Sequence, residues 1–139
     1  MREPKFRAWD KVTNKYYVVS TLEYADNGEL CEVWLADIPI TETNDACRNP
    51  KDVILEQYTG LKDKNDKEIA VGDIVKARWL RAKNARLNTR GEVKFGGGWF
   101  YIYDDPDGQD RLGAPIHNCY QLEIVGNIHE NPELLEEEE

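Results

Sequence analysis

In the stretch Ile74-Val75-Lys76-Ala77-Arg78-Trp79, apolar and charged residues alternate along the chain. A period of two is typical of a half-buried β-strand, because successive side chains point to opposite faces. The apolar residues of this stretch are expected to face a core and its two basic residues to face outward. After Gly91, the segment Glu92-Val93-Lys94-Phe95 has a matching pattern, and we predict that it pairs with this strand.

The same alternation, with β-branched and aromatic residues, marks six further segments. Turn-forming residues separate them, among them Asn27-Gly28 and the triplet Gly96-Gly97-Gly98. No long helical period competes with this pattern, so the sequence predicts a mainly β fold, with a small, strongly bent sheet or barrel. A loop with one short helical turn is expected at residues 38–50, and a short helix is expected to begin at Asn131-Pro132. The six segments are residues 5–10, 16–24, 31–35, 53–58, 99–103 and 120–125.

The composition is that of one compact domain. The chain has 139 residues, of which 40% are hydrophobic, enough for a core and too many for a disordered chain. Its three cysteines are widely spaced and predict reduced thiols rather than a disulfide framework. No stretch reaches the roughly 20 apolar residues of a membrane span, and the first residues lack the apolar segment of a signal peptide. We therefore expect a soluble, cytoplasmic protein without a membrane partner.

Charge is unevenly distributed along the chain. The net charge of −9 argues against nucleic-acid binding by the whole surface. Residues 76–94 reverse this balance, because seven basic residues stand there against Glu92 alone. We expect these residues to lie on a long hairpin. The seven are Lys76, Arg78, Arg81, Lys83, Arg86, Arg90 and Lys94.

Three interpretations of this basic segment remain open. The hairpin could be an arm that contacts nucleic-acid phosphates and recognises shape or backbone rather than base sequence. The same charges could instead keep an exposed hairpin in solution and discourage pairing at its edges. The arm could also meet the acidic end of the chain, residues 133–139, within one chain or between subunits.

Candidate catalytic residues are sparse. Ser20 is the only serine, and no glycine elbow surrounds it. His117 and Cys119 have no further cysteine or histidine pair to complete a zinc site. Three aspartates within residues 105–110 imitate part of a calcium loop but lack its final glutamate. We therefore expect a protein that is not an enzyme and holds no cofactor or metal, with a metal-dependent enzyme as the least favoured alternative.

Four tryptophans are more than a core of this size usually needs. Aromatic residues are favoured in subunit interfaces, so we expect at least one of them in an interface and a homo-oligomer as the result. A stacking platform for nucleic-acid bases is the less favoured alternative. The four are Trp9, Trp34, Trp79 and Trp99.

Three separated blocks of the sequence resemble a known protein family. The first is Phe6-Arg7-Ala8-Trp9-Asp10. The second is Gln57-Tyr58-Thr59-Gly60-Leu61-Lys62-Asp63 with Glu68-Ile69 and Gly72-Asp73-Ile74-Val75. The third is Val125-Gly126-Asn127-Ile128-His129-Glu130-Asn131-Pro132-Glu133-Leu134-Leu135. Together, and in this order, the blocks resemble the YopX family across nearly the whole chain.

The resemblance implies a bacteriophage or prophage origin and a family without an established biochemical activity. It also implies an SH3-like β-barrel from about residue 57 onward, with the amino-terminal strands packed against it. The chain departs from the family at Asn65-Asp66, where members usually have Asn-Gly, and in a longer and more basic stretch after residue 75. We expect three parts in one domain, which are residues 1–56, 57–128 and 129–139.

These observations predict an accessory protein that acts by binding. Self-assembly is the first hypothesis, and nucleic-acid contact through residues 76–94 is the second. A host or phage protein is a further expected partner, which the acidic residues 136–139 could attract by imitating nucleic acid. The glycines of the shared blocks are expected to serve the backbone, either in unusual conformations or at close approaches.

Overall fold

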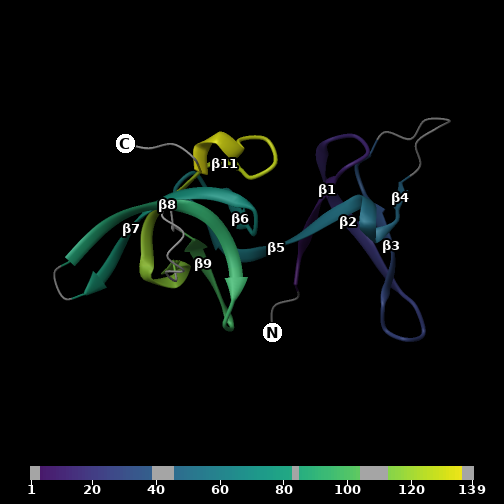
Figure 1. The fold of residues 1–139 in the computed structure, drawn as a ribbon, viewed down its shortest axis with the longest axis horizontal. Helices are drawn as coiled ribbons and strands as arrows, with labels where there is room; N and C mark the ends of the chain where they lie inside the picture. Colours follow the sequence, from purple (N-terminus) through teal and green to yellow (C-terminus); the bar gives the residue numbers. More distant parts are fainter. Residues whose placement is uncertain (1–3, 39–45, 83–84, 104–112, 136–139) are drawn as a thin grey trace. The chain divides into compact units, whose positions relative to one another are not determined.

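The computed structural model describes residues 4–38, 46–82, 85–103 and 113–135, and within these ranges the side chains of all residues except 79–87. The described part of the chain consists of antiparallel β-strands and three short 3-10 helices (Figure 1). The strands are β1 (Phe6–Asp10), β2 (Lys15–Tyr24), β3 (Leu30–Leu35), β4 (Cys47–Arg48), β5 (Val53–Lys62), β6 (Glu68–Ala70), β7 (Asp73–Ala82), β8 (Ala85–Gly96), β9 (Trp99–Tyr103), β10 (Ala114–Pro115) and β11 (Cys119–Asn127). The 3-10 helices are η1 (Pro50–Asp52), η2 (Ile116–Asn118) and η3 (Pro132–Leu135).

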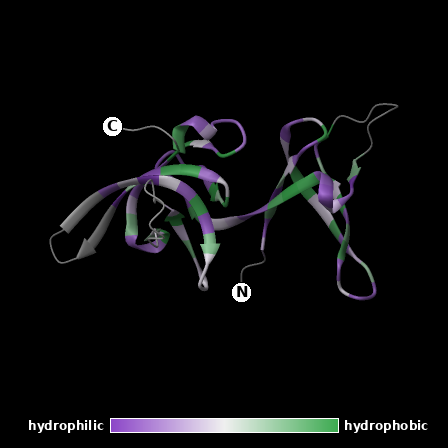
Figure 2. Cartoon of the chain, in the orientation of Figure 1, coloured by the Kyte–Doolittle hydropathy of each residue, from purple (hydrophilic) through white to green (hydrophobic). Residues whose placement is uncertain are grey.

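The predicted mainly β fold is confirmed, and the alternation of polarity that predicted it is visible along the strands (Figure 2). In β7, buried Val75 and Ala77 alternate with exposed Lys76 and Arg78. All seven segments with this pattern, residues 74–79 among them, lie in strands, except that β1 begins at Phe6 and leaves Lys5 outside. Strand formation therefore follows from burial of one side of each segment.

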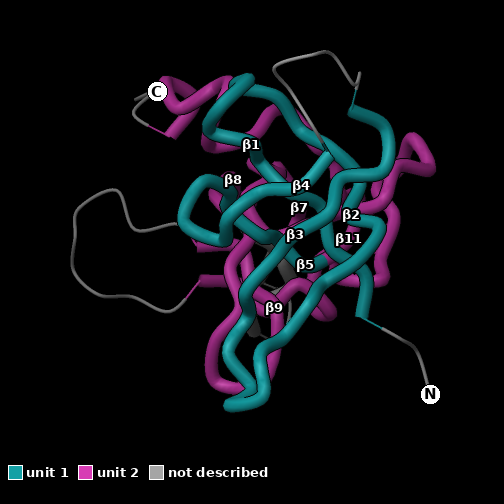
Figure 3. Tube along the Cα trace, turned by 90° about the vertical axis from the view of Figure 1, so that its right-hand side faces the viewer, with its two compact units in different colours: residues 1–57 teal, residues 58–139 magenta. Residues whose placement is uncertain are grey.

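The chain divides into two compact units, Met1–Gln57 and Tyr58–Glu139, which Figure 3 draws in teal and magenta. The division falls within β5, whose first half pairs with β1 and whose second half pairs with β6. Each unit has its own cluster of buried apolar side chains. We call them the amino-terminal unit and the carboxy-terminal unit.

In the amino-terminal unit, the strand order is β4-β3-β2-β1-β5, with antiparallel neighbours throughout. The predicted hairpin of residues 16–35 is confirmed, because β2 pairs with β3. One side of this sheet is covered by its core. The buried apolar members of the core are Ala8, Tyr17, Val33, Leu35, Ile38 and Val53.

A buried ion pair joins β1 to β4, although these two strands are not neighbours in the sheet. The Asp10 carboxylate is fully buried and accepts hydrogen bonds from Nε and Nη2 of Arg48 at 2.9 and 3.2 Å. The Thr13 hydroxyl and the Val12 amide donate to the same carboxylate. Burial by itself would raise the pKa of Asp10, but these hydrogen bonds, with Arg48 first, hold it below its usual value. A charge paired in this way fixes β1 relative to β4.

In the carboxy-terminal unit, the five-stranded sheet has the order β10-β9-β8-β7-β11. Strands β7 to β10 form a meander, and β11 returns to pair with β7 after η2. In the described residues no pairing joins the edge strands β10 and β11, so a closed barrel is not seen. The sheet surrounds a core whose buried members are Ile69, Val75, Ala77, Val93, Ile102 and Ile116.

Three details of the sequence prediction are corrected. The partner of residues 74–79 is residues 87–92, because both strands of the hairpin continue to Ala82 and Ala85, and residues 93–96 pair with β9 instead. The short helix after Asn131 is the 3-10 helix η3 alone. The expected loop at residues 38–50, of which residues 39–45 lie outside the described ranges, contains the unexpected strand β4. Its expected helical turn is found where η1 begins, and there the Asn49 side chain accepts from the Lys51 amide.

Candidate functional site

The face of β7 that points away from the core carries basic side chains. Lys76 and Arg78 are exposed, whereas the apolar residues that alternate with them are buried. The register places Lys76 opposite Arg90 on β8, and directly opposed residues of an antiparallel pair lie on the same face. Lys94 lies four residues after Arg90 on β8 and therefore also projects from this face.

Strands β9 and β11 add tyrosines to the same face. The register places Tyr101 opposite Lys94, and Tyr103 is two residues further along β9. The rings of Tyr101 and Tyr103 are 6.5 Å apart, and the Lys94 ammonium is 4.3 Å from the centroid of the Tyr103 ring. On the other side of β7, Tyr120 of β11 lies opposite Arg78 and is 37% exposed. We call this surface the basic-aromatic face. Its members are Lys76, Arg78, Arg90, Lys94, Tyr101, Tyr103 and Tyr120.

Two carboxylates moderate the charge of the basic-aromatic face. Glu92 lies between Arg90 and Lys94 on β8, and Glu123 of β11 lies opposite Lys76. The Glu123 carboxylate is 3.3 Å from the Lys64 ammonium and 3.4 Å from that of Lys76. These two lysines, with Lys64 first, hold the pKa of Glu123 below its usual value against the opposing effect of burial. Lys76 is thus partly neutralised, whereas no carboxylate of the described residues pairs with Arg78.

Four of the seven basic residues singled out in the sequence are brought together by the fold: Lys76, Arg78, Arg90 and Lys94. The expected hairpin is confirmed by the pairing of β7 with β8. Arg81 and Arg86 lie in its strands, where the structure describes the backbone only, and Lys83 lies outside the described residues. The acidic residues 136–139 also lie outside them.

The sequence prediction missed the three tyrosines of this face. It placed residues 99–103 and 120–125 in strands, but the faces on which their aromatic residues lie depend on the register with β8 and β7. One local feature of the sequence could have revealed the position of Tyr101. Lys94 and Tyr101 are equidistant from the glycine turn between β8 and β9, and a tight hairpin places such residues opposite each other.

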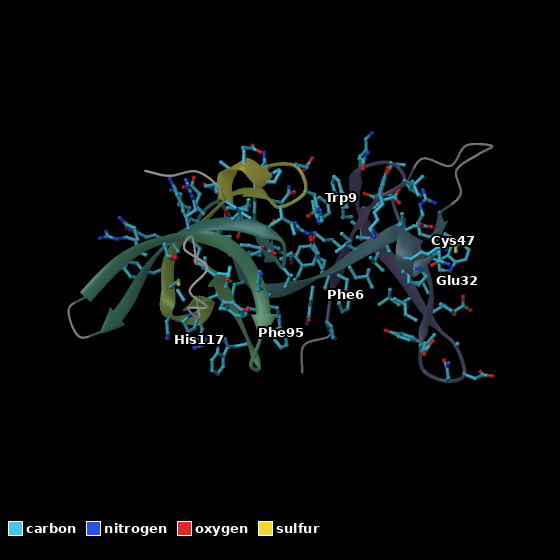
Figure 4. All side chains as sticks on the ribbon, in the orientation of Figure 1. Phe6, Trp9, Glu32, Cys47, Phe95 and His117 are labelled. Atoms are coloured by element: carbon cyan, nitrogen blue, oxygen red, sulfur yellow. The ribbon has the colours of Figure 1, made fainter. Side chains whose placement is uncertain are left out.

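A second surface lies at the turn between β8 and β9. Phe95 is 56% exposed and its ring is 4.9 Å from that of Phe100, its cross-strand neighbour. Trp99 is 48% exposed, and its ring is 6.4 Å from the exposed His117. Figure 4 shows Phe95 and His117 at the same end of the carboxy-terminal unit. We call this surface the aromatic edge, with the members Phe95, Trp99, Phe100 and His117.

The candidate catalytic residues Cys119 and Ser20 each donate a hydrogen bond to a backbone carbonyl. The Cys119 thiol donates to the Pro115 carbonyl at 3.4 Å, and burial raises its pKa to about 11, which is the opposite of activation as a nucleophile. The Ser20 hydroxyl donates to the Trp34 carbonyl. Within the described ranges, no three His, Cys, Asp or Glu residues are grouped so that they could hold a metal ion. The aspartates of residues 105–110 lie outside those ranges.

Comparison with known protein families assigns the chain to one of them. The model of the family described as "YopX protein" matches residues 5–136, which is nearly the whole chain. The chain belongs to the YopX family. The resemblance stated from its three sequence blocks is therefore confirmed.

Among solved structures, this YopX protein is similar to the crystal structure of protein EF1440 from Enterococcus faecalis. The two share 28% sequence identity with a TM-score of 0.63, and the match covers 97% of this chain and 99% of that one. No curated protein matches the chain. A search of the described residues for helices long and apolar enough to cross a membrane finds none.

The shared YopX blocks have structural roles in this chain, and Asp63 illustrates this best. Its buried carboxylate accepts hydrogen bonds from the amides of Asn65, Lys67 and Ile124 at 2.9 to 3.0 Å. Burial would raise the pKa of Asp63, but these amides, with Ile124 first, hold it below its usual value. A carboxylate that is saturated by backbone donors closes a turn and anchors it to β11.

In the last YopX block, side chains also hydrogen-bond to backbone amides of the same block. The Asn131 side-chain oxygen accepts from the Asn127 amide at 3.2 Å, and the Asn127 side chain accepts from the amides of His129 and Glu130. A Cβ atom on Gly126 would lie 2.7 Å from that Asn131 oxygen, so a side chain is excluded there. The expectation of a close approach at this glycine is confirmed.

Proposed function

We propose that this YopX protein is a non-enzymatic binding module that contacts nucleic acid through its basic-aromatic face. One observation carries the proposal: the registers of β7, β8 and β9 gather Lys76, Arg78, Arg90 and Lys94 on one face of an otherwise acidic chain. Nucleic-acid binding depends first on phosphate contacts by Lys and Arg, and a local cluster provides them even where the net charge is negative.

Two further observations support this proposal. Lys76 and Arg78 are two residues apart on β7, about 7 Å along the strand, and cross-strand neighbours are about 5 Å apart. Several phosphates of one nucleic-acid strand are therefore within reach. In the shared YopX blocks, Asp10, Asp63 and Asn131 make hydrogen bonds that hold the fold together. This supports a role in binding rather than catalysis.

The test is binding of labelled oligonucleotides at increasing salt concentration. The double variant Arg78→Glu, Lys94→Glu is compared with Lys15→Glu, Lys51→Glu, which makes the same change of charge at exposed sites of the amino-terminal unit. We expect the first variant to bind more weakly and to lower the slope of log affinity against log salt by about 2, roughly one for each lost phosphate contact. Equal loss in both variants would show that the face itself is not the site.

A second candidate function is self-association through the aromatic edge. Phe95 and Trp99 are about half exposed and adjacent across one turn, and such aromatic area is favoured at subunit contacts. Light scattering over a range of protein concentrations tests this. A homo-oligomer is expected to dissociate in the variant Phe95→Ser, Trp99→Ser and to persist in Tyr24→Ser, whose tyrosine is 59% exposed in the other unit. A wild-type monomer at every concentration would exclude it.

For the carboxy-terminal unit, we propose the SH3-like arrangement that the YopX resemblance implies. Its support is the chain order: a four-stranded meander, a 3-10 helix, and a last strand that returns beside the first. An experimental structure that placed β11 away from β7 would contradict it. A bacteriophage or prophage origin remains a prediction of the family membership. A cytoplasmic location and a host or phage protein partner remain predictions of the sequence itself.

A further inference from the structure

We infer that the ligand of the basic-aromatic face is single-stranded nucleic acid, whose bases stack on Tyr101 and Tyr120 while its phosphates meet the basic residues between them. This inference rests on the proposed function and names its ligand class. It starts from the order of side chains across the sheet. A path over β11, β7, β8 and β9 meets Tyr120, then Arg78 and Lys76, then Arg90 and Lys94 with Glu92 between them, and finally Tyr101.

The dimensions of this path suit a short single strand. Three strand spacings of about 4.8 Å separate β11 from β9, and Arg90 lies about 13 Å from Lys94 along β8. The path therefore spans a few nucleotides, within the range of about 4–16 nucleotides that small sheet domains cover. Aromatic side chains at its two ends and cations between them are the combination that single-strand binders use.

Tyr101 and Tyr120, at the two ends of the path, differ from Tyr103 in whether a cation already covers the ring. The Lys94 ammonium lies over the Tyr103 ring, so this ring is already engaged on one side. Tyr120 is 37% exposed, and Tyr101 is half-buried beside Gly96, where a Cβ atom would lie 3.4 Å from its ring. We therefore assign stacking to Tyr101 and Tyr120 and assign to Tyr103 the positioning of Lys94.

The shape of the sheet favours a single strand over a duplex. The basic-aromatic face is the outer side of a sheet that bends around its core, and the long curve of β8 is evident in Figure 1. A duplex is stiff, with a persistence length of about 50 nm, and can touch such a convex face at few phosphates. Its bases are also stacked on one another, so they offer no ring surface to the tyrosines. A flexible single strand can follow the curve and stack.

The test compares labelled oligonucleotides of about ten nucleotides, at about 50 mM salt, with the full chain. The probes are a thymidine strand, a uridine strand, the corresponding DNA duplex and an abasic strand with the same phosphates. We expect both single strands to bind at least about tenfold more tightly than the duplex, and the abasic strand to bind about as weakly as the duplex. Since each stacked base contributes about 1–3 kcal/mol, Tyr101→Leu and Tyr120→Leu should each weaken binding about 5- to 150-fold.

The control variant is Tyr24→Leu, an exposed tyrosine of the amino-terminal unit, and circular dichroism verifies that each variant is folded. If abasic and normal strands bind equally well and the two leucine variants leave affinity unchanged, the inference is wrong while the proposed function stands. If neither strand nor duplex binds, the proposed function itself fails. The abasic probe keeps the test decisive even where a leucine variant fails to fold, because it leaves the protein unchanged.

Discussion

At the scale of single residues, the buried charges of Asp10 and Asp63 are compensated in different ways. Asp10 and Asp63 are both buried carboxylates, and each has its negative charge compensated by several donors. The two solutions differ. Asp10 uses the guanidinium of Arg48, 38 positions away, whereas Asp63 uses backbone amides alone. Loss of a compensating partner therefore has different consequences at the two sites.

Substitution Arg48→Ala is expected to lower the free energy of unfolding by about 3–5 kcal/mol, because it leaves the Asp10 charge buried without its main partner. Urea unfolding at neutral pH measures this. Lys51→Ala, which removes an exposed cation of the same unit, should change the free energy by less than about 0.5 kcal/mol. Adding Asp10→Asn to Arg48→Ala should recover part of the loss, since an amide carries no charge. A cost below about 1 kcal/mol for Arg48→Ala would contradict the assigned role.

The pH dependence of stability follows from the same groups. Folding lowers the pKa of Asp10 and of Asp63, so the folded state holds their protons less tightly than the unfolded state. Their stabilisation is complete above the ordinary carboxyl value of 3.8 and is lost as the pH falls through their lower folded values. Acid unfolding between about pH 4 and pH 2 should thus be flatter in Asp63→Asn than in the wild-type chain. An unchanged acid limb in Asp63→Asn would show that this carboxylate does not contribute.

At the scale of elements, alternation predicted where the long strands lie but not how distant strands pair. Residues 74–79 and 99–103 show a period of two, which depends only on neighbours in sequence. The pairing of β1 with β5 and of β7 with β11 joins segments that are far apart, and no local pattern encodes their registers. The strands β4, β6 and β10 have only two or three residues and are too short to show a period.

The pairing of β2 with β3 includes an unfavourable contact between like charges, which the sequence pattern did not reveal. The register of β2 with β3 places Glu23 directly opposite Glu32, and the exposed Trp34 indole donates to the Glu32 carboxylate. Like charges opposite each other weaken a strand pair. The pKa of Glu23 is raised, first by sharing a hydrogen bond with Glu32 and then by the charge of that residue.

Glu23→Gln is therefore expected to raise the melting temperature at neutral pH. A raised folded pKa means that the pair is most favourable when protonated. The wild-type chain therefore gains stability as the pH falls through the folded pKa of Glu23, and this gain is complete below the ordinary value of 4.5. The difference between variant and wild type should disappear in that range. Thermal unfolding at several pH values measures it, and Glu29→Gln in the adjacent turn is the matched control. A variant that melted below the wild-type chain at neutral pH would refute the repulsion.

At the scale of the whole molecule, the charge of the chain and that of its candidate site are opposite in sign. The net charge is −9, yet four basic residues share one face of the carboxy-terminal sheet. The sequence predicted an outward face of the hairpin with Lys76, Arg78 and Lys94, but it placed Arg90 at the tip. Arg90 joins Lys76 on that face through the register of β8. The tyrosines of the face needed two further registers, and these arise from tertiary packing rather than from local composition.

If the proposed function holds, acidic residues away from the face should slow the approach of nucleic acid. The variant Asp66→Asn, Glu133→Gln removes two exposed carboxylates of the carboxy-terminal unit. We expect a faster association rate at low ionic strength, no difference at high ionic strength, and an unchanged dissociation rate. Stopped-flow fluorescence measures both rates. An effect on the dissociation rate alone would place these carboxylates at the contact itself.

The hydrogen bond from the Ile124 amide to Asp63 spans 61 positions of the chain. Synthesis on the ribosome proceeds from the amino terminus, so the Asp63 carboxylate emerges long before its partner does. The strands of the amino-terminal unit find their described partners within the first 57 residues, and this unit can fold while translation continues. The carboxy-terminal unit has to wait for β11. A nascent chain that stalls before β11 therefore carries a finished first half and a second half that a chaperone or protease can still engage.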